Sequence, residues 1–198
     1  RLKDFLLMIF CVSKADIAEI NLTLLGQLIK SFGVASIHRR ITLARGSEMH
    51  KSTVLVTGGT DSIGSQVVRE LMSDDEIVRI VVLGRTERRH EKLKELLGGR
   101  KGFEKVTQII GDVRDYMSVL SAANECDSII HTAAMKYVPY CEENVWEAIE
   151  TNIIGAKNIR DVCVGLAIEK LVVVSTDKAV EHQGVMGATK WLQERIFL

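Results

Sequence analysis

The chain has a single proline, no net charge and no apolar run long enough to cross a membrane. Its 198 residues include 26 basic and 26 acidic side chains, a balance that favours neither nucleic acid nor an anionic membrane as a partner. The longest apolar run near the start, residues 5–12, is far shorter than the roughly 20 residues that a membrane-spanning helix requires. No small-residue cleavage site follows this run cleanly, so we expect a cytoplasmic protein.

Cysteine is scarce, and its spacing argues against two common kinds of site. Cys11, Cys126, Cys141 and Cys163 form no CxxC pair and have no neighbouring histidines. Buried free thiols in a reducing compartment are therefore expected, with neither a disulfide framework nor a metal site.

The chain divides into two parts of different character. Residues 1–50 show helical periodicity in Leu22, Leu25, Ile29 and Phe32 and no strand pattern, which predicts an N-terminal helical extension of one or two helices. In residues 51–198, apolar strands alternate with amphipathic helices, which predicts an α/β domain with a doubly wound parallel sheet of at least five strands. The expected strands are 53–57, 77–83, 106–110, 127–131 and 171–175, and the expected helices are 62–73, 87–97, 115–123, 142–163 and 187–197.

A glycine-rich turn follows the first of these strands and opens a helix. Glycines in this position let the backbone approach a pyrophosphate, which then lies at the helix N-terminus, so the fold is expected to be Rossmann-like. Asp61 stands where a third glycine is expected, and direct contact would weaken dinucleotide binding by on the order of 1–3 kcal/mol. The alternative is a turn that merely permits tight packing. The candidate cofactor-binding residues here are Thr57, Gly58, Thr60, Asp61, Ser62, Ile63 and Gly64.

The ends of the next three strands add weaker cofactor signals. Arg85, with Arg88 or Arg89, is suited to a 2′-phosphate, which favours NADP over NAD, although a solvated basic turn remains the alternative. Asp112 and Val113 follow the third strand, where an adenine would lie. Ala133 and Ala134 follow the fourth and are small enough to let a cofactor pass.

Polar residues also follow the fifth strand. Ser175 and Thr176 come directly before Asp177 and Lys178, at the carboxyl end where an open α/β sheet binds its ligand. A hydroxyl, a carboxylate and an amine together indicate proton transfer, although a strand end with a polar turn would look the same. Lys190 lies four residues after Met186, so the two share one face of a helix.

Taken together, these motifs resemble the extended short-chain dehydrogenase/reductase superfamily. Within it they are most similar to the nucleotide-sugar 4,6-dehydratases of the polysaccharide-biosynthesis type, which act on UDP-N-acetylglucosamine. The resemblance covers residues 53–198. It rests on Val-Thr-Gly-Gly-Thr-x-Ser-Ile-Gly-Ser from Val56, Gly-Asp-Val-Arg-Asp from Gly111, His-Thr-Ala-Ala-Met-Lys-Tyr-Val-Pro from His131, Thr-Asn-Ile-x-Gly-Ala-x-Asn from Thr151, Ser-Thr-Asp-Lys-Ala-Val from Ser175 and Met-Gly-Ala-Thr-Lys from Met186.

The resemblance implies an enzyme that oxidises the sugar C4 transiently with bound NADP and eliminates water across C5 and C6. Asp177 and Lys178 would handle the C5 and C6 protons, and Thr176 would hydrogen-bond the C4 oxygen. Lys190 would hold the nicotinamide ribose, and Asn152 would join the cofactor residues. Lys136 and Tyr137 would border the sugar or nicotinamide pocket. Relatives continue with a substrate-binding region, so we expect this chain to hold the cofactor half.

Met186 departs from the resemblance, because many relatives carry a catalytic tyrosine there and methionine cannot exchange a proton. One membrane-associated branch of the family shares this methionine. Two alternatives therefore stay open: a nucleotide-sugar epimerase, and a non-catalytic nucleotide-binding or assembly module, which Asp61 and Met186 favour. A UDP-sugar is the expected partner, and helix 142–163 is the candidate contact of a homo-oligomer.

Overall fold

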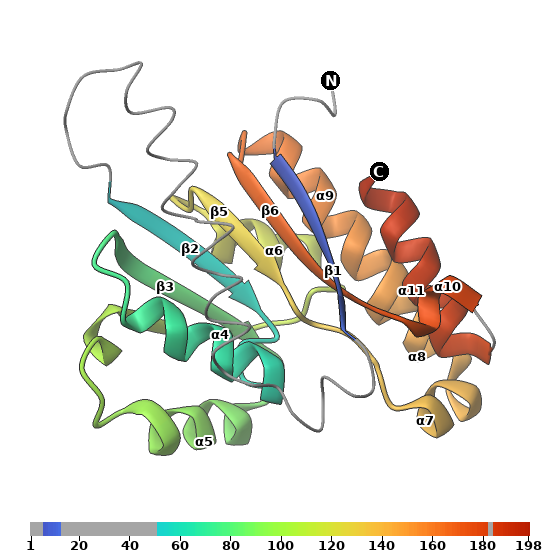
Figure 1. Cartoon of the computed structure of the whole chain (residues 1–198), viewed down its shortest axis with the longest axis horizontal. Helices are drawn as coiled ribbons and strands as arrows, with labels where there is room; N and C mark the ends of the chain where they lie inside the picture. Colours follow the sequence, from blue (N-terminus) through green and yellow to red (C-terminus); the bar gives the residue numbers. More distant parts are fainter. Residues whose placement is uncertain (1–5, 13–50, 182–183) are drawn as a thin grey trace.

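The computed structural model describes residues 6–12, 51–181 and 184–198, and it contains one six-stranded sheet. The sheet order is β1-β6-β5-β2-β3-β4, and every neighbouring pair of strands is parallel (Figure 1). The fold is therefore the expected α/β Rossmann-like fold. The strands are β1 Leu6–Val12, β2 Ser52–Thr57, β3 Ile77–Gly84, β4 Val106–Ile110, β5 Ser128–His131 and β6 Lys170–Thr176.

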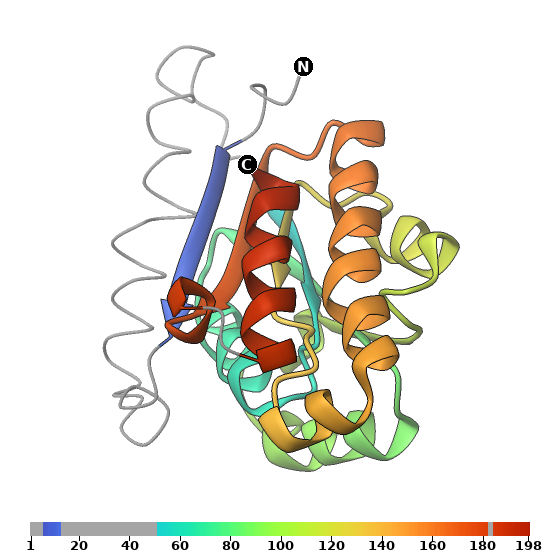
Figure 2. The ribbon, with the colours of Figure 1, turned by 90° about the vertical axis from the view of Figure 1, so that its right-hand side faces the viewer.

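Helices cover both faces of the sheet, and in β2, β3, β5 and β6 alternate residues supply the two cores. In β2, Leu55 packs into the core under α6, α9 and α11, whereas Val54 and Val56 pack into the core under α4 and α5. Burial on both faces explains why the strands read as continuous apolar runs. Figure 2 shows α9 and α11 on one face of the sheet. The helices are α4 Ser62–Met72, α5 Glu87–Leu97, α6 Tyr116–Ala123, α7 Val138–Glu143, α8 Val145–Ile149, α9 Gly155–Gly165, α10 Lys178–Glu181 and α11 Gly184–Phe197, with a short 3₁₀ turn η1 Phe103–Lys105 and a π-helical segment η2 Glu150–Ile154.

Two expectations about elements are wrong. Residues 6–12 form the edge strand β1, paired with β6 from Leu6 opposite Lys170 to Val12 opposite Thr176, so this part of residues 1–50 is not helical. The rest of the predicted helical extension, with Leu22, Leu25, Ile29 and Phe32, lies outside the described residues.

The predicted helix 142–163 is also not one uninterrupted helix. It is preceded by α7, and the backbone of Asn144 (φ −129°, ψ 60°) separates α7 from α8. Pro139 lies in the first turn of α7 rather than in a loop, because a first-turn proline loses no helical hydrogen bond. Val145, the first residue of α8, is exposed.

Three cysteines behave as expected. Cys126, Cys141 and Cys163 are buried free thiols, and burial raises the pKa of Cys126 and of Cys163 to about 12. Across the described ranges, no helix combines the length and apolarity needed to cross a bilayer.

The strand register aligns the carboxyl ends of the three central strands. Thr57 of β2 lies opposite His131 of β5, which lies opposite Val173 of β6. His131 is fully buried, and its Nδ1 is 2.7 Å from the Thr57 hydroxyl. The loops that follow these strands therefore emerge at one edge of the sheet.

His131 should make the stability of the fold depend on pH. Burial, with a smaller effect from the positive charge of Lys190, lowers the pKa of His131 from 6.5 to about 3. The unfolded chain therefore takes up a proton that the folded chain does not, and stability is lost as the pH falls from about 6.5 towards 3. Between pH 7 and pH 5, His131 should account for about 2 kcal/mol of the fall in unfolding free energy.

Urea unfolding of the wild type and of His131→Gln at pH 7 and pH 5 measures this contribution. Glutamine keeps a polar group beside Thr57 but does not titrate. Equal falls in unfolding free energy for the two proteins would contradict the prediction.

Candidate functional site

The turn between β2 and α4 packs backbone against backbone. Gly58 has a φ of +68°, and a Cβ there would lie 2.7 Å from the backbone of Ala133. A Cβ on Gly64 would lie 2.2 Å from the carbonyl oxygen of Gly58. Both positions therefore require glycine, which explains two glycines of the motif by the geometry of this turn alone.

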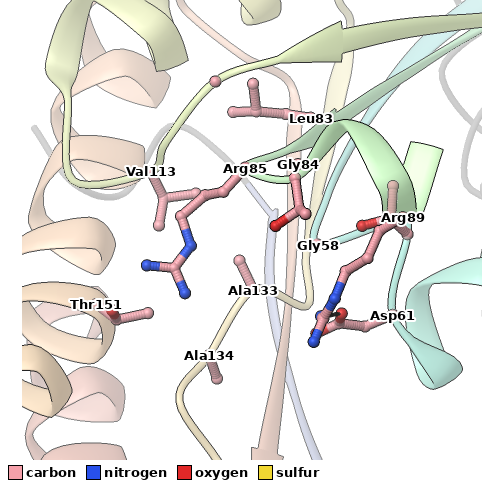
Figure 3. Close-up of a pocket in the computed structure, with 13 residues that line it drawn as sticks. Gly58, Asp61, Leu83, Gly84, Arg85, Arg89, Val113, Ala133, Ala134 and Thr151 are labelled. Atoms are coloured by element: carbon pink, nitrogen blue, oxygen red, sulfur yellow. Dashed lines mark hydrogen bonds and ion pairs between the residues drawn. The ribbon is translucent and has the colours of Figure 1, made fainter. Parts of the chain in front are cut away.

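A pocket with about 120 Å³ of free volume opens beside this turn (Figure 3). Its walls come from the loops after β2, β3, β4 and β5, together with η2. Its size is below the roughly 300–1,000 Å³ of a complete small-molecule site, so it has room for only part of a large ligand. The lining residues are Gly58, Thr60, Asp61, Leu83, Gly84, Arg85, Thr86, Arg89, Gly111, Val113, Ala133, Ala134 and Thr151.

Seven of the residues predicted to bind the cofactor meet in this pocket: Gly58, Thr60, Asp61, Arg85, Val113, Ala133 and Ala134. The others are near it but outside its lining: Thr57, Ser62, Ile63, Gly64, Asp112, Lys136, Asn152 and Lys190. Most of the predicted residues therefore cluster around the turn, whereas Lys190 lies in α11 and contacts Val174 and Gln193.

Asp61 is the charged residue of the turn, and it is held by two cations. Its Oδ1 is hydrogen-bonded to Arg89 Nη1, and its Oδ2 lies 4.0 Å from Lys136 Nζ. The Asp61 backbone is extended, with φ −86°, so this position does not need glycine for conformational reasons. The substitution therefore changes the charge of the pocket rather than the path of the chain.

On the opposite wall of the pocket, the carboxylate of Asp112 lies beside two arginines. Asp112 Oδ2 lies 2.7 Å from Arg114 Nη2 and 3.8 Å from Arg85 Nη1. The hydrogen bond that Arg114 donates to Asp112 raises the pKa of Arg114, and nearby Glu147 adds to this rise. Arg85 is half-exposed and lines the pocket, as the sequence predicted, but it faces a carboxylate already.

Thr151 is a lining residue that sequence reasoning missed. Its hydroxyl is buried and has no hydrogen-bond partner among the described residues. Thr151 lies in η2, where a π turn holds more residues than an α turn. A prediction based on α-helical periodicity therefore assigns the wrong side chain to the face that lines the pocket. The neighbouring Asn152 instead bonds the Met135 backbone through both amide atoms, at 2.8 and 2.9 Å, and Thr189 Oγ1 at 3.0 Å.

The predicted catalytic residues lie at the end of β6. Thr176 Oγ1 donates to Asp177 Oδ1 at 3.0 Å, and Lys178 Nζ lies 3.9 Å from the same oxygen. Asp177 and Lys178 are partly exposed, so both can reach a ligand from outside. Since β6 is separated from β2 only by β5, the two strands lie about 10 Å apart across the sheet. Thr176 stands three residues further along β6 than Val173, which is level with Thr57.

Met186 and Lys190 of α11 are both buried. Met186 packs with Cys141 and Ala148, and its side chain cannot exchange protons. Lys190 Nζ donates to the carbonyl of Val174 at 2.7 Å and to Gln193 Oε1. Lys136 and Tyr137, by contrast, are exposed in the loop after β5.

The pocket fits the adenosine and pyrophosphate part of a nicotinamide dinucleotide at most positions. The glycine turn leads into a helix N-terminus, the two alanines leave space, and the Thr151 hydroxyl offers an unused hydrogen bond. Arg85 and Arg89 supply positive charge. Asp61 is the one lining residue whose charge opposes this ligand.

Comparison with known proteins agrees with the architecture of the fold. Solved structures that share the fold include Pen of Bacillus thuringiensis (32% identical, TM-score 0.68, covering 76% of this chain and 45% of that one). Another is the UDP-glucose 4-epimerase of Bifidobacterium longum, solved with NAD⁺ and UDP (22% identical, TM-score 0.63, covering 74% and 48%).

The sequence itself identifies the family. Residues 54–198 match the polysaccharide biosynthesis protein family, and the chain belongs to that family. It is 42% identical over 148 residues to an uncharacterised membrane protein of Methanocaldococcus jannaschii, and 39% identical over 147 residues to the UDP-glucose 4-epimerase of Rickettsia canadensis. Each match covers 73% of this chain and 42% of the relative, so the chain spans less than half the length of these relatives.

Proposed function

We propose that this chain is the cofactor-binding half of a nucleotide-sugar 4,6-dehydratase that acts on UDP-N-acetylglucosamine or a close analogue. Asp177 and Lys178 carry this proposal. An adjacent carboxylate and amine at the carboxyl end of a central strand suit an elimination, which needs a base at one carbon and an acid at the next. Membership of the polysaccharide biosynthesis family supports a role in making glycans.

The residues at this edge of the sheet would have separate tasks. A bound nicotinamide dinucleotide would supply the redox chemistry, taking a hydride from the sugar C4 and returning it to C6 after water has left. Thr176 would hydrogen-bond the C4 oxygen, Lys178 Nζ would take the proton from C5, and Asp177 would give a proton to the departing C6 hydroxyl. Lys190, which donates to Val174 and Gln193, would place its ammonium beside the cofactor ribose.

Arg85 and Arg89 in the pocket support a preference for NADP, since a guanidinium matches a 2′-phosphate. Their pairing with Asp112 and Asp61 reduces that preference, so NAD remains an acceptable cofactor.

A nucleotide-sugar 4-epimerase is the second candidate. Relatives 36–39% identical to this chain are named UDP-glucose 4-epimerase, which favours it. Epimerisation needs no acid at C6, whereas elimination does, and this difference makes the two reactions separable by their products.

A titration followed by product analysis tests the proposal. We expect the protein to bind NADP⁺ or NAD⁺ in calorimetry and, when joined to the substrate-binding region of a relative, to convert UDP-N-acetylglucosamine into a 4-keto-6-deoxy sugar without net cofactor reduction. A product that has retained its C6 hydroxyl and inverted C4 would establish the epimerase instead. Cofactor binding without turnover of either sugar nucleotide would favour the non-catalytic module, and no cofactor binding would exclude both enzymes for this chain.

A further inference from the structure

Asp61 and its two partners join three separate segments across the mouth of the pocket. Arg89 comes from the first turn of α5 and Lys136 from the loop after β5, and both face the carboxylate at the start of α4. The Asp61 side chain is 19% exposed, whereas those of Arg89 and Lys136 are 57% and 46% exposed. We refer to Asp61, Arg89 and Lys136 as the Asp61 triad, and Figure 3 shows Arg89 reaching Asp61.

The Asp61 side chain does not cap the helix that it begins. An aspartate at this position normally accepts hydrogen bonds from backbone N–H groups of the first turn. Asp115, the equivalent residue of α6, does so, accepting from Met117 N at 3.1 Å and Ser118 N at 3.2 Å. Asp61 makes no such bond, because its carboxylate is turned towards Arg89.

The orientation of this carboxylate decides whether an external anion can use the start of α4. The N-terminus of a helix attracts one anion through its N–H groups and its dipole. A carboxylate that capped the helix would occupy that place and would also repel a pyrophosphate. Turned towards Arg89, it leaves the place available.

We propose, on the basis of the proposed function, that Arg89 is a positioning residue for dinucleotide binding, with Lys136 in support. Arg89 holds the Asp61 carboxylate away from the α4 N-terminus and neutralises it, so that this turn accepts an anionic ligand although it lacks its third glycine. The triad has two positive charges and one negative charge, so it presents a net positive charge to the pyrophosphate.

A double-mutant cycle in NAD⁺ affinity tests this role. NAD⁺ is the probe because it has no 2′-phosphate that Arg89 could contact directly. We expect Arg89→Met to weaken NAD⁺ binding by about tenfold, the equivalent of one N-cap interaction of a charged side chain. In the Asp61→Gly background, the same change should weaken binding by less than about twofold, because no carboxylate remains to be held. Asp61→Gly alone should tighten binding.

Two further variants separate this role from general charge and folding effects. Arg89→Lys keeps the cation and should retain most of the affinity. Lys92→Met removes the same charge from an exposed position one turn further along α5 and should leave affinity within about twofold, since surface charges act weakly at a distance. Circular dichroism melting of every variant establishes that it is folded.

The outcomes distinguish this proposal from the proposed function. Equal losses from Arg89→Met in both backgrounds would mean that Arg89 contacts the ligand itself, and no loss in the wild-type background would mean that Asp61 needs no restraint. Either result overturns the positioning role alone. If no variant binds NAD⁺, Asp61→Gly included, the positioning role and the proposed function both fail.

Discussion

Replacing Gly64 with alanine should destabilise the protein by about 3 kcal/mol, the upper part of the range for a side chain inserted into a packed site. The new Cβ would lie 2.2 Å from the carbonyl oxygen of Gly58 and 2.6 Å from the Cα of Gly59. Both contacts are with backbone, so no rotamer change can relieve them, and α4 must move away from the turn. Urea unfolding measures the loss, and cofactor titration of the surviving folded protein should show weaker binding because the turn lines the pocket.

Gly165 provides the matched control. It is the last residue of α9, and a Cβ there would have nothing within 4 Å. Gly165→Ala should therefore be neutral or stabilising by about 0.4–1 kcal/mol through the unfolded chain. If Gly64→Ala unfolds within about 0.5 kcal/mol of the wild type, the close packing of the turn is not what keeps glycine at this position.

The sequence predicted the sheet well because buried parallel strands leave a strong signal. Both faces of β2 and β3 pack into cores, so these strands read as unbroken apolar runs between amphipathic helices. Residues 6–12 carry the same signal, but a short apolar run next to a helical pattern is ambiguous. It is resolved only by the position of β1 beside β6 at the edge of the sheet.

The site was predictable where backbone geometry demands particular residues. Gly58 needs a positive φ and Gly64 a close approach, and both requirements appear in the sequence as glycine. The partners of Asp61 were not predictable, since Arg89 lies 28 residues away and Lys136 lies in another loop. In the sequence, an aspartate at position 61 is a departure from the glycine motif. In the folded protein, the cations of Arg89 and Lys136 lie beside its carboxylate.

The order of the strands explains why the reacting groups and the cofactor turn can act together although they are far apart in the sequence. Gly58 and Asp177 are separated along the chain by most of the domain, yet β2 and β6 both flank β5 and run in the same direction. Their carboxyl ends therefore share one edge. Ligands of open α/β sheets bind at this edge, and the proposed sugar site would extend from the pocket towards β6.

Lys178→Met and Asp177→Asn should each lower the rate of sugar-nucleotide dehydration by at least about 100-fold, since loss of a general acid or base typically costs between 10² and 10⁴ in rate. Under the proposed function, Lys178→Met should also abolish the exchange of the C5 proton with solvent deuterium, because the base that removes this proton is gone. Cofactor affinity should stay within about twofold, since neither residue lines the cofactor pocket. Folding should be unaffected, because a partly exposed ion pair contributes at most about 1 kcal/mol.

Lys157 and Asp161 form the matched control pair. Lys157 Nζ lies 2.7 Å from Asp161 Oδ2 on the exposed side of α9, so Lys157→Met and Asp161→Asn break a comparable ion pair outside the reacting groups. Rates of both controls should equal that of the wild type. If Lys178→Met keeps full dehydration and C5 exchange, Lys178 is not the base. If neither Asp177→Asn nor Lys178→Met lowers the rate while cofactor still binds, the carboxyl end of β6 holds no acid–base pair. The non-catalytic module then becomes the better explanation of what this chain does.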